Sequence, residues 1–228
     1  MRKFLFVFLA AMLLPVPRVN AAENLKSVLA KLNAAAQGFR TTSADFEFDS
    51  VTTVPIEDKE VQTGTVYYER AGHAFKMAAH IQKVDGQPVP KTYMFVNGEF
   101  KLWEGGNLDQ VTTFARGSKY ESYLMLGFGA SGADLEDKWN ITFDGMETVA
   151  GLPAAKLELV AKDPEVRKNI PKVTVWMDLA RGISLKQVFD EGQGQTRTCT
   201  YSNFKLNQDL PKDAFTYKTD KNTQYIKR

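Results

Sequence analysis

The chain has few of the residues that build redox or metal sites. Its 228 residues include one cysteine and two histidines. Cys199 cannot pair within the chain, and its place in a strand pattern predicts a small buried apolar group. His73 and His80 have no second ligand at the spacing of a zinc site. We therefore expect no metal and no cofactor.

The chain also lacks a strong excess of charge. Residues 1–21 hold three basic residues and no acidic one, which leaves 26 basic and 27 acidic residues in the remainder. A nucleic-acid partner would require a clustered basic face. The nearly neutral remainder predicts that nucleic acid is not the partner.

No catalytic constellation is present in the sequence. There is no G-x-S-x-G elbow, and the acidic residues are scattered through turns and outward positions. The run 127–132 fits G-x-G-x-x-G literally. It follows a predicted helix in an antiparallel pattern, whereas a dinucleotide site needs a preceding strand in a parallel unit. We interpret these glycines as hinges and predict that the protein is not an enzyme.

No apolar run is long enough to cross a bilayer, and the first 21 residues have the pattern of a signal peptide. Arg2 and Lys3 precede the apolar run 4–14, and Val19-Asn20-Ala21 forms a small-residue cleavage site. An uncleaved anchor is the less favoured alternative. The sequence thus predicts an exported, soluble protein that is cleaved near Ala21, with residues 22–228 forming a single domain.

The segment after the signal is an amphipathic helix that ends near Gly38. Its apolar residues fall on one stripe at helical spacing: Leu25, Val28, Leu29, Leu32 and Phe39. From Thr41 the apolar period changes to two, which is typical of strands. Asn97-Gly98 favours a type I′ hairpin turn, and the block 172–218 predicts an antiparallel meander. These patterns indicate an α+β domain with about nine to eleven antiparallel strands.

The strand pattern stops between Arg116 and Trp139. This segment is apolar at helical spacings and interrupted by glycines, and a second short helix is predicted over 133–138. We interpret it as a mobile cover, or lid, inserted into the sheet. Residues 163–170 are predicted to be a charged connector.

The strands carry more apolar bulk than one helix can cover. In one interpretation all of it is solid core. In the other, a strongly curved sheet leaves an apolar concavity with the insertion as its lid. The residues alone leave both interpretations open.

The order of elements resembles the periplasmic outer-membrane lipoprotein carrier (LolA-like) family over nearly all of the chain after the signal. The similarity rests on order and spacing, carried by these features: the helix ending in Phe39, the Phe46 strand, Gly64 to Tyr68, Arg70 before Phe75, Val96-Asn97-Gly98, Leu102-Trp103, Val175-Trp176-Met177-Asp178, Gly182, Tyr201-Ser202-Asn203, Asn207 and Phe215. Leu126-Gly127-Phe128-Gly129 and Asp134-Leu135 look like the broader lipoprotein-sorting group.

The resemblance implies an incomplete antiparallel β-barrel of about eleven strands, with helices closing an apolar cavity. The cavity residues would be Val66, Tyr68, Phe75, Met77, Phe95, Leu102, Val175 and Met177, and the lid residues Tyr123, Leu124, Leu126 and Phe128. A monomeric periplasmic carrier would take an acylated lipoprotein, or another lipid, from an inner-membrane releasing complex to an outer-membrane acceptor.

Arg70 matches the position of the family's lid-latching arginine. The family often has proline after this arginine, whereas this chain has Ala71, and the stretch to Phe75 is one residue longer.

Two alternatives accompany the carrier: an envelope-stress sensor or regulator with the same fold, and a carrier of a lipid other than a lipoprotein. We expect the carrier, because such regulators usually have a second domain and the chain ends at Arg228.

Overall fold

The computed structural model describes residues 24–71, 74–114, 123 and 126–228. The predicted signal peptide, His73 and Leu124 lie outside these residues. Among the described helices, none combines the length and the apolar character needed to span a membrane.

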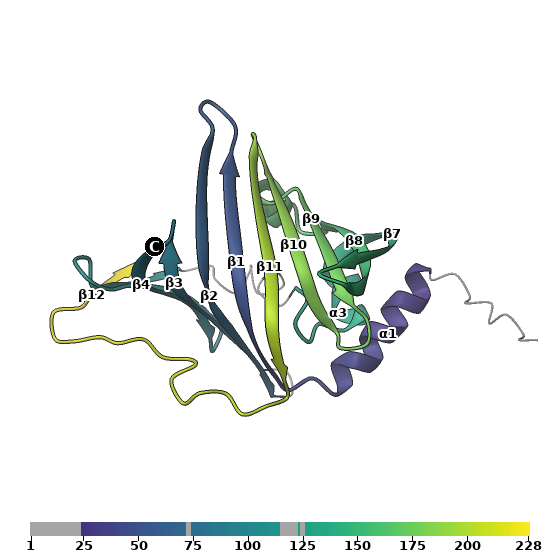
Figure 1. Cartoon of the computed structure of the whole chain (residues 1–228), viewed down its shortest axis with the longest axis horizontal. Helices are drawn as coiled ribbons and strands as arrows, with labels where there is room; N and C mark the ends of the chain where they lie inside the picture. The colour runs from purple at the N-terminus through teal and green to yellow at the C-terminus, as the bar shows by residue number, and fades with distance from the viewer. Residues whose placement is uncertain (1–23, 72–73, 115–122, 124–125) are drawn as a thin grey trace, which may run out of the picture.

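In the described part of the chain, twelve strands form one strongly curved sheet (Figure 1). Their order across the sheet is β12-β6-β5-β4-β3-β2-β1-β11-β10-β9-β8-β7. The strands are β1 (Thr41–Thr52), β2 (Asp58–Ala71), β3 (Ala74–Val84), β4 (Gln87–Val96), β5 (Glu99–Glu104), β6 (Gln110–Phe114), β7 (Trp139–Val149), β8 (Leu152–Ala161), β9 (Lys172–Asp178), β10 (Ile183–Gly192), β11 (Gln195–Leu206) and β12 (Gln224–Lys227).

The topology places β1 in the middle, between β2 and β11, so the two halves of the chain meet there. All neighbouring strands pair antiparallel except β12, which pairs parallel with β6. The predicted class, an open antiparallel barrel with helices, is confirmed. The predicted number of strands, at most eleven, is one below the twelve observed. The strand that was missed is β12, which is only four residues long and pairs with a strand more than a hundred residues away.

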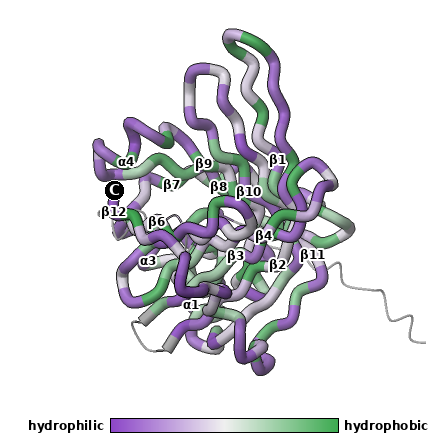
Figure 2. Tube along the Cα trace, turned by 90° about the vertical axis from the view of Figure 1, so that its left-hand side faces the viewer, coloured by the Kyte–Doolittle hydropathy of each residue, from purple (hydrophilic) through white to green (hydrophobic). Residues whose placement is uncertain are grey.

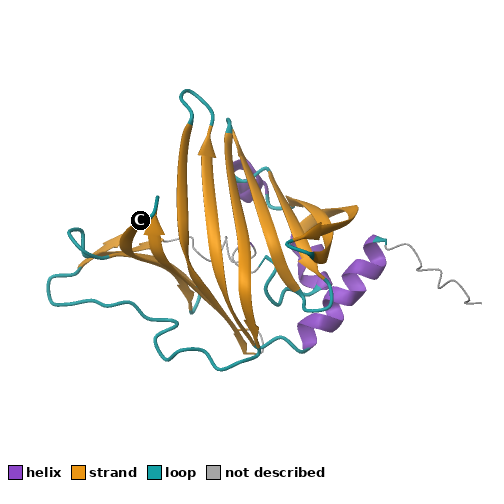
Figure 3. Ribbon diagram, in the orientation of Figure 1, coloured by secondary structure: helices purple, strands orange, loops and turns teal. Residues whose placement is uncertain are grey.

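Helix α1 (Leu25–Gln37) lies on the β7–β9 side of the sheet (Figure 3). Asn24 caps its first turn in a reciprocal capping box with Ser27. Its buried stripe of Val28, Leu29 and Leu32 packs in one core cluster with residues of β8 and β9. The predicted helix and its apolar stripe are confirmed.

Two shorter helices flank this half of the sheet. Helix α3 (Gly132–Lys138) was predicted, but helix α4 (Pro164–Asn169), which lies within the connector predicted over 163–170, was not. The signal was present in the sequence: Asp163 accepts hydrogen bonds from two first-turn N–H groups, and Pro164 occupies the first turn.

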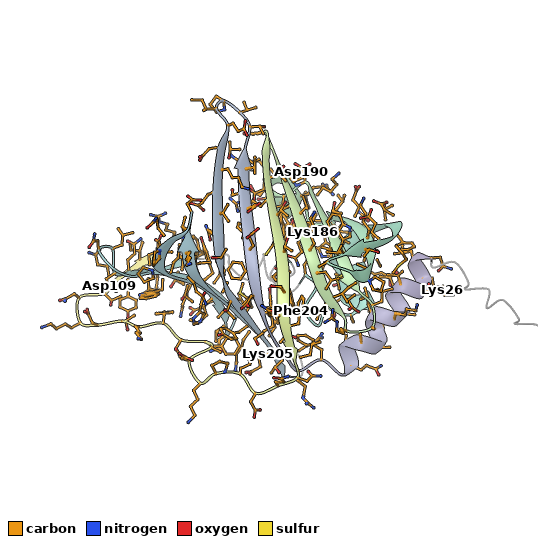
Figure 4. The ribbon with its side chains drawn as sticks, in the orientation of Figure 1. Lys26, Asp109, Lys186, Asp190, Phe204 and Lys205 are labelled. Atoms are coloured by element: carbon orange, nitrogen blue, oxygen red, sulfur yellow. The ribbon has the colours of Figure 1, made fainter. Side chains whose placement is uncertain are left out.

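The predicted hairpin turn at Asn97-Gly98 is confirmed, since φ is 55° and 75° at these two residues. Hydrophobic and hydrophilic residues alternate along much of the sheet (Figure 2). On β10, Lys186 and Asp190 lie on the outer face (Figure 4), whereas Gln187 and Phe189 line the hollow inner face. This alternation gives the sheet one apolar inner surface.

Candidate functional site

The inner face of the curved sheet encloses a cavity of about 500 Å³. This volume lies within the range of roughly 300–1,000 Å³ that small-molecule sites occupy. The residues that line it are Phe46, Phe48, Ser50, Glu60, Gln62, Val66, Tyr68, Met77, Ala79, Ile81, Lys91, Tyr93, Phe100, Tyr123, Gln187, Phe189, Arg197, Cys199 and Tyr201. The interpretation of the sheet as a solid core is therefore excluded.

The lining changes from apolar to charged along the strands. Phe46 lies beside Tyr201, and two residues along β1, Phe48 lies beside Cys199. The next row toward the strand ends holds Ser50 between Glu60 and the exposed Arg197. The cavity therefore has an apolar interior and a charged mouth beside the β1–β2 turn.

Phe128 packs behind two tyrosines that line the other end of the cavity. Its fully buried ring stacks on Tyr68, with centroids 4.0 Å apart, and meets the ring of Tyr201 edge-on at 4.9 Å. Burial and the neighbouring Cys199 raise the pKa of Tyr68, so its hydroxyl stays protonated at neutral pH. These three rings form an uncharged floor.

Arg70 connects strand β2 to the lid. Its guanidinium donates a hydrogen bond to the carbonyl oxygen of Gly129, and it lies 3.5 Å from the carboxylate of Asp134. Asp134 in turn accepts a hydrogen bond from the N–H of Ser131, the N-cap of α3. Partial burial raises the pKa of Asp134, but hydrogen bonds with Ser131 and the charge of Arg70 outweigh it and hold that pKa below its usual value.

The lid glycines allow close packing, a role that the hinge interpretation did not include. A Cβ on Gly127 would lie 2.1 Å from the Ser184 side chain, and one on Gly132 would lie 2.4 Å from the carbonyl oxygen of Leu29. Gly127 also accepts a 2.6 Å hydrogen bond from the N–H of Ser184 on β10. The lid backbone is thus held directly against β10 and α1.

A second polar side chain reaches the lid from within the cavity. The Gln187 amide on β10 donates a 2.5 Å hydrogen bond to the carbonyl oxygen of Leu126 and accepts one of 3.1 Å from the Tyr201 hydroxyl. Sequence reasoning missed Gln187. The available signal was its position between Leu185 and Phe189, two residues away on either side, where the alternation calls for an apolar residue.

The residues predicted for the cavity occupy three different environments. Val66, Tyr68 and Met77 line it. Phe75 and Phe95 are buried in the same core cluster without lining the cavity, and Leu102 on β5 is half-buried outside the lining. Val175 and Met177 are buried in the other cluster, because α1 and the lid cover the inner face of β9.

Of the residues predicted for the lid, Tyr123 reaches the cavity wall, and Leu126 and Phe128 are buried. Leu124 lies outside the described residues. Over the described ranges, no three His, Cys, Asp or Glu side chains gather closely enough to hold a metal ion.

Comparison with known proteins gave matches in structure only. No family model and no curated protein matches the sequence. An uncharacterised conserved protein from Thermus thermophilus matches with a TM-score of 0.54 and 12% identity, over 89% of this chain and 98% of that one. MucB matches with a TM-score of 0.52 and 14% identity, over 89% of this chain.

The chain spans 65% of the length of MucB, a protein also solved as a complex with MucA from Pseudomonas aeruginosa. A LolA superfamily protein from Nitrosomonas europaea is also among the matches, with a TM-score of 0.43 and 15% identity, over 86% of this chain and 98% of that one. At these identities the Thermus protein and MucB establish the fold alone. The chain shares with them the open, curved sheet that surrounds the cavity.

Proposed function

We propose that this protein is a carrier that holds the acyl chain of a lipid or lipoprotein in its cavity and passes it on. The observation that carries the proposal is the cavity, with an apolar interior, one end at Tyr68 backed by Phe128 and a charged mouth at Arg197. An acyl chain that enters the interior gains about 0.8 kcal/mol for each CH₂ removed from water. The charged mouth leaves the polar headgroup in contact with solvent.

A carrier must also release its cargo, and the Arg70 contact provides a means. The hydrogen bond from Arg70 to Gly129 stabilises the closed lid, in which Phe128 fills the floor. Cargo that needs the space of Phe128 must displace the lid. By linkage, stability of the closed state then opposes cargo binding and weakens the hold on the cargo.

The resemblance to the LolA-like family supports the finer form of the proposal. In that form an exported, monomeric protein receives an acylated lipoprotein from a releasing complex in the inner membrane and delivers it to an acceptor in the outer membrane. The cavity volume is compatible with a free lipid as well, since an apolar interior recognises the chain and not the headgroup.

A second candidate is a regulator that binds a protein partner. One observation favours it: MucB, which shares the fold, was solved in complex with MucA. In this case the cavity would sense a ligand, and the partner would bind elsewhere on the surface.

Native mass spectrometry of the protein purified from the cell envelope of its own organism tests these proposals. A bound lipoprotein or lipid mass, lost in the cavity-filled variant Ala79→Trp, supports the carrier. A bound protein without an acyl chain, retained by Ala79→Trp, supports the regulator. Protein that is free of both, and that also takes up no added fatty-acyl ester, contradicts the carrier.

A further inference from the structure

Gln187 places a buried amide in the wall of an otherwise largely apolar interior. The residue is 3% exposed, and it lines the cavity together with Tyr201, which is 8% exposed. A buried polar group is costly unless it is hydrogen-bonded. An apolar residue would fill this position without that cost, so the amide calls for an explanation.

The hydrogen bonds of Gln187 join the cavity wall to the lid. One amide N–H is donated to Leu126, and the amide oxygen accepts the hydroxyl of Tyr201. A glutamine side chain offers two N–H donors and an oxygen with two lone pairs. Among the described residues, the contacts with Leu126 and Tyr201 engage one donor and one lone pair, so the amide can turn to a ligand and keep its bond to Tyr201.

The two side chains that fasten the lid differ in their access to cargo. Arg70 contacts Gly129 from β2 and is not part of the cavity lining, whereas Gln187 contacts Leu126 from β10 and is part of it. The Gln187 end of its contact is therefore open to a ligand in the cavity. Gln187 on β10 pairs with Cys199 on β11. Cys199 lies two residues along β11 from Arg197, which stands at the charged mouth.

We propose that Gln187, supported by Tyr201, recognises the carbonyl group of an acyl ester or amide and couples its arrival to release of the lid. The proposal rests on the carrier function and specifies its cargo. The carbonyl oxygen of the cargo accepts the amide N–H in place of the Leu126 carbonyl, while the chain extends into the apolar interior. A plain hydrocarbon fills the same interior and leaves the Leu126 contact in place.

Competition binding with a matched ligand pair tests the recognition. Methyl laurate and the alkane of the same length are each used to displace N-phenyl-1-naphthylamine from the full chain. We expect wild type to prefer the ester and Gln187→Met to lose this preference, because methionine has no N–H to pass from Leu126 to the ester carbonyl. Gln82→Met is the control, because Gln82 is an exposed glutamine that bonds to Thr65 and does not line the cavity.

Hydrogen exchange of residues 126–138 provides the second measurement. In wild type and Gln82→Met, the ester should speed exchange of this segment more than the alkane does. In Gln187→Met the segment should exchange quickly before ligand is added, with equal effects of the two ligands. Tyr201→Phe removes a single oxygen and should reduce the ester preference in the same direction.

Three results would overturn the proposal. An equal ester preference in wild type and Gln187→Met would reject carbonyl recognition and leave the carrier function intact. Equal effects of ester and alkane on lid exchange in wild type would reject the coupling. If neither ligand displaces the dye from wild type, the carrier function fails together with this proposal.

Discussion

Tyr68 of β2 and Phe128 of the lid stack face to face, with ring centroids 4.0 Å apart and an interplanar angle of 9°. Arg70 lies two residues further along the same face of β2 and bonds to Gly129, the residue after Phe128. One strand therefore holds the lid through an apolar contact and a polar contact side by side. Stacking closes the floor of the cavity, and the guanidinium fixes the backbone that carries the ring.

The first prediction concerns Arg70. Arg70→Leu removes the hydrogen bond to Gly129 and the contact with Asp134, so the closed empty state loses stability. We expect the variant to bind acyl cargo at least as tightly as wild type and to transfer it poorly to acceptor vesicles. Binding and transfer are measured separately, with Arg40→Leu as an exposed control. Equal transfer by wild type and Arg70→Leu would reject the latch.

The second prediction concerns the pH dependence of the Arg70–Asp134 contact. Asp134 has a folded pKa below its ordinary value of 3.8, so its charged form is favoured in the folded state. The stabilisation is complete above pH 3.8 and is lost as the pH falls through the folded pKa. Asp134→Asn should therefore be less stable than wild type at neutral pH, by an amount that shrinks in acid.

Urea unfolding of the two proteins over this pH range measures the difference. Glu136→Gln is the control, because Glu136 is an exposed carboxylate on the same helix. A stability difference between wild type and Asp134→Asn that does not change with pH would show that the carboxylate charge does not act at this site.

The third prediction concerns the close approach of the lid to Phe39, just after α1. Gly129 has a φ of 74°, and a Cβ there would lie 2.4 Å from the ring of Phe39. Gly129→Ala should lower the free energy of unfolding by about 2–5 kcal/mol, from backbone strain together with overpacking. Gly98→Ala is a matched control, since Gly98 has a φ of 75° and open space around it. Gly98→Ala should lower the free energy of unfolding by the backbone strain alone, about 1–2 kcal/mol.

Denaturant unfolding of both variants provides the comparison. Similar losses at Gly129 and Gly98 would mean that the lid moves aside at little cost, and that the packing against Phe39 does not hold it.

Much of this fold could be predicted from the sequence because its periodicity is local. The alternation around Phe46 and Phe48, the helical stripe of Leu25 to Leu32, and the Asn97-Gly98 turn each depend on neighbouring residues alone. Alternation also shows which residues of a strand share a face. It therefore placed Val66 and Tyr68 on one face together, and the family resemblance implied that this face lines the cavity.

What the sequence could not show is which inner faces are covered by other elements. Val175 alternates as Val66 does, but α1 and the lid fill the space above β9, while the space above β2 stays hollow. That difference arises from contacts between residues far apart in the chain. The close packing at glycines 127 and 132 could not be predicted for the same reason, because their neighbours Ser184 and Leu29 are distant in sequence.

The last prediction uses Cys199 as a reporter of cavity occupancy. This residue is the one cysteine of the chain, is 5% exposed and lines the cavity. Burial raises the pKa of its thiol from 9.0 to about 12, against a smaller opposing effect of Tyr201. The thiolate fraction at neutral pH is therefore about a thousandfold lower than that of an ordinary thiol, and the thiolate is the reactive form.

Labelling of Cys199 by a maleimide should accordingly be slow at neutral pH and should accelerate steadily as the pH rises. Methyl laurate in the cavity should slow it further, because the acyl chain covers the sulfur. The control is Cys199→Ser combined with Thr200→Cys, which moves the thiol one residue along β11 to an exposed position on the outer face. Its labelling should be fast and insensitive to methyl laurate, as intact mass measurements can show. Equal protection of both thiols would place the ligand outside the cavity, since residues 199 and 200 lie on opposite faces of the same strand.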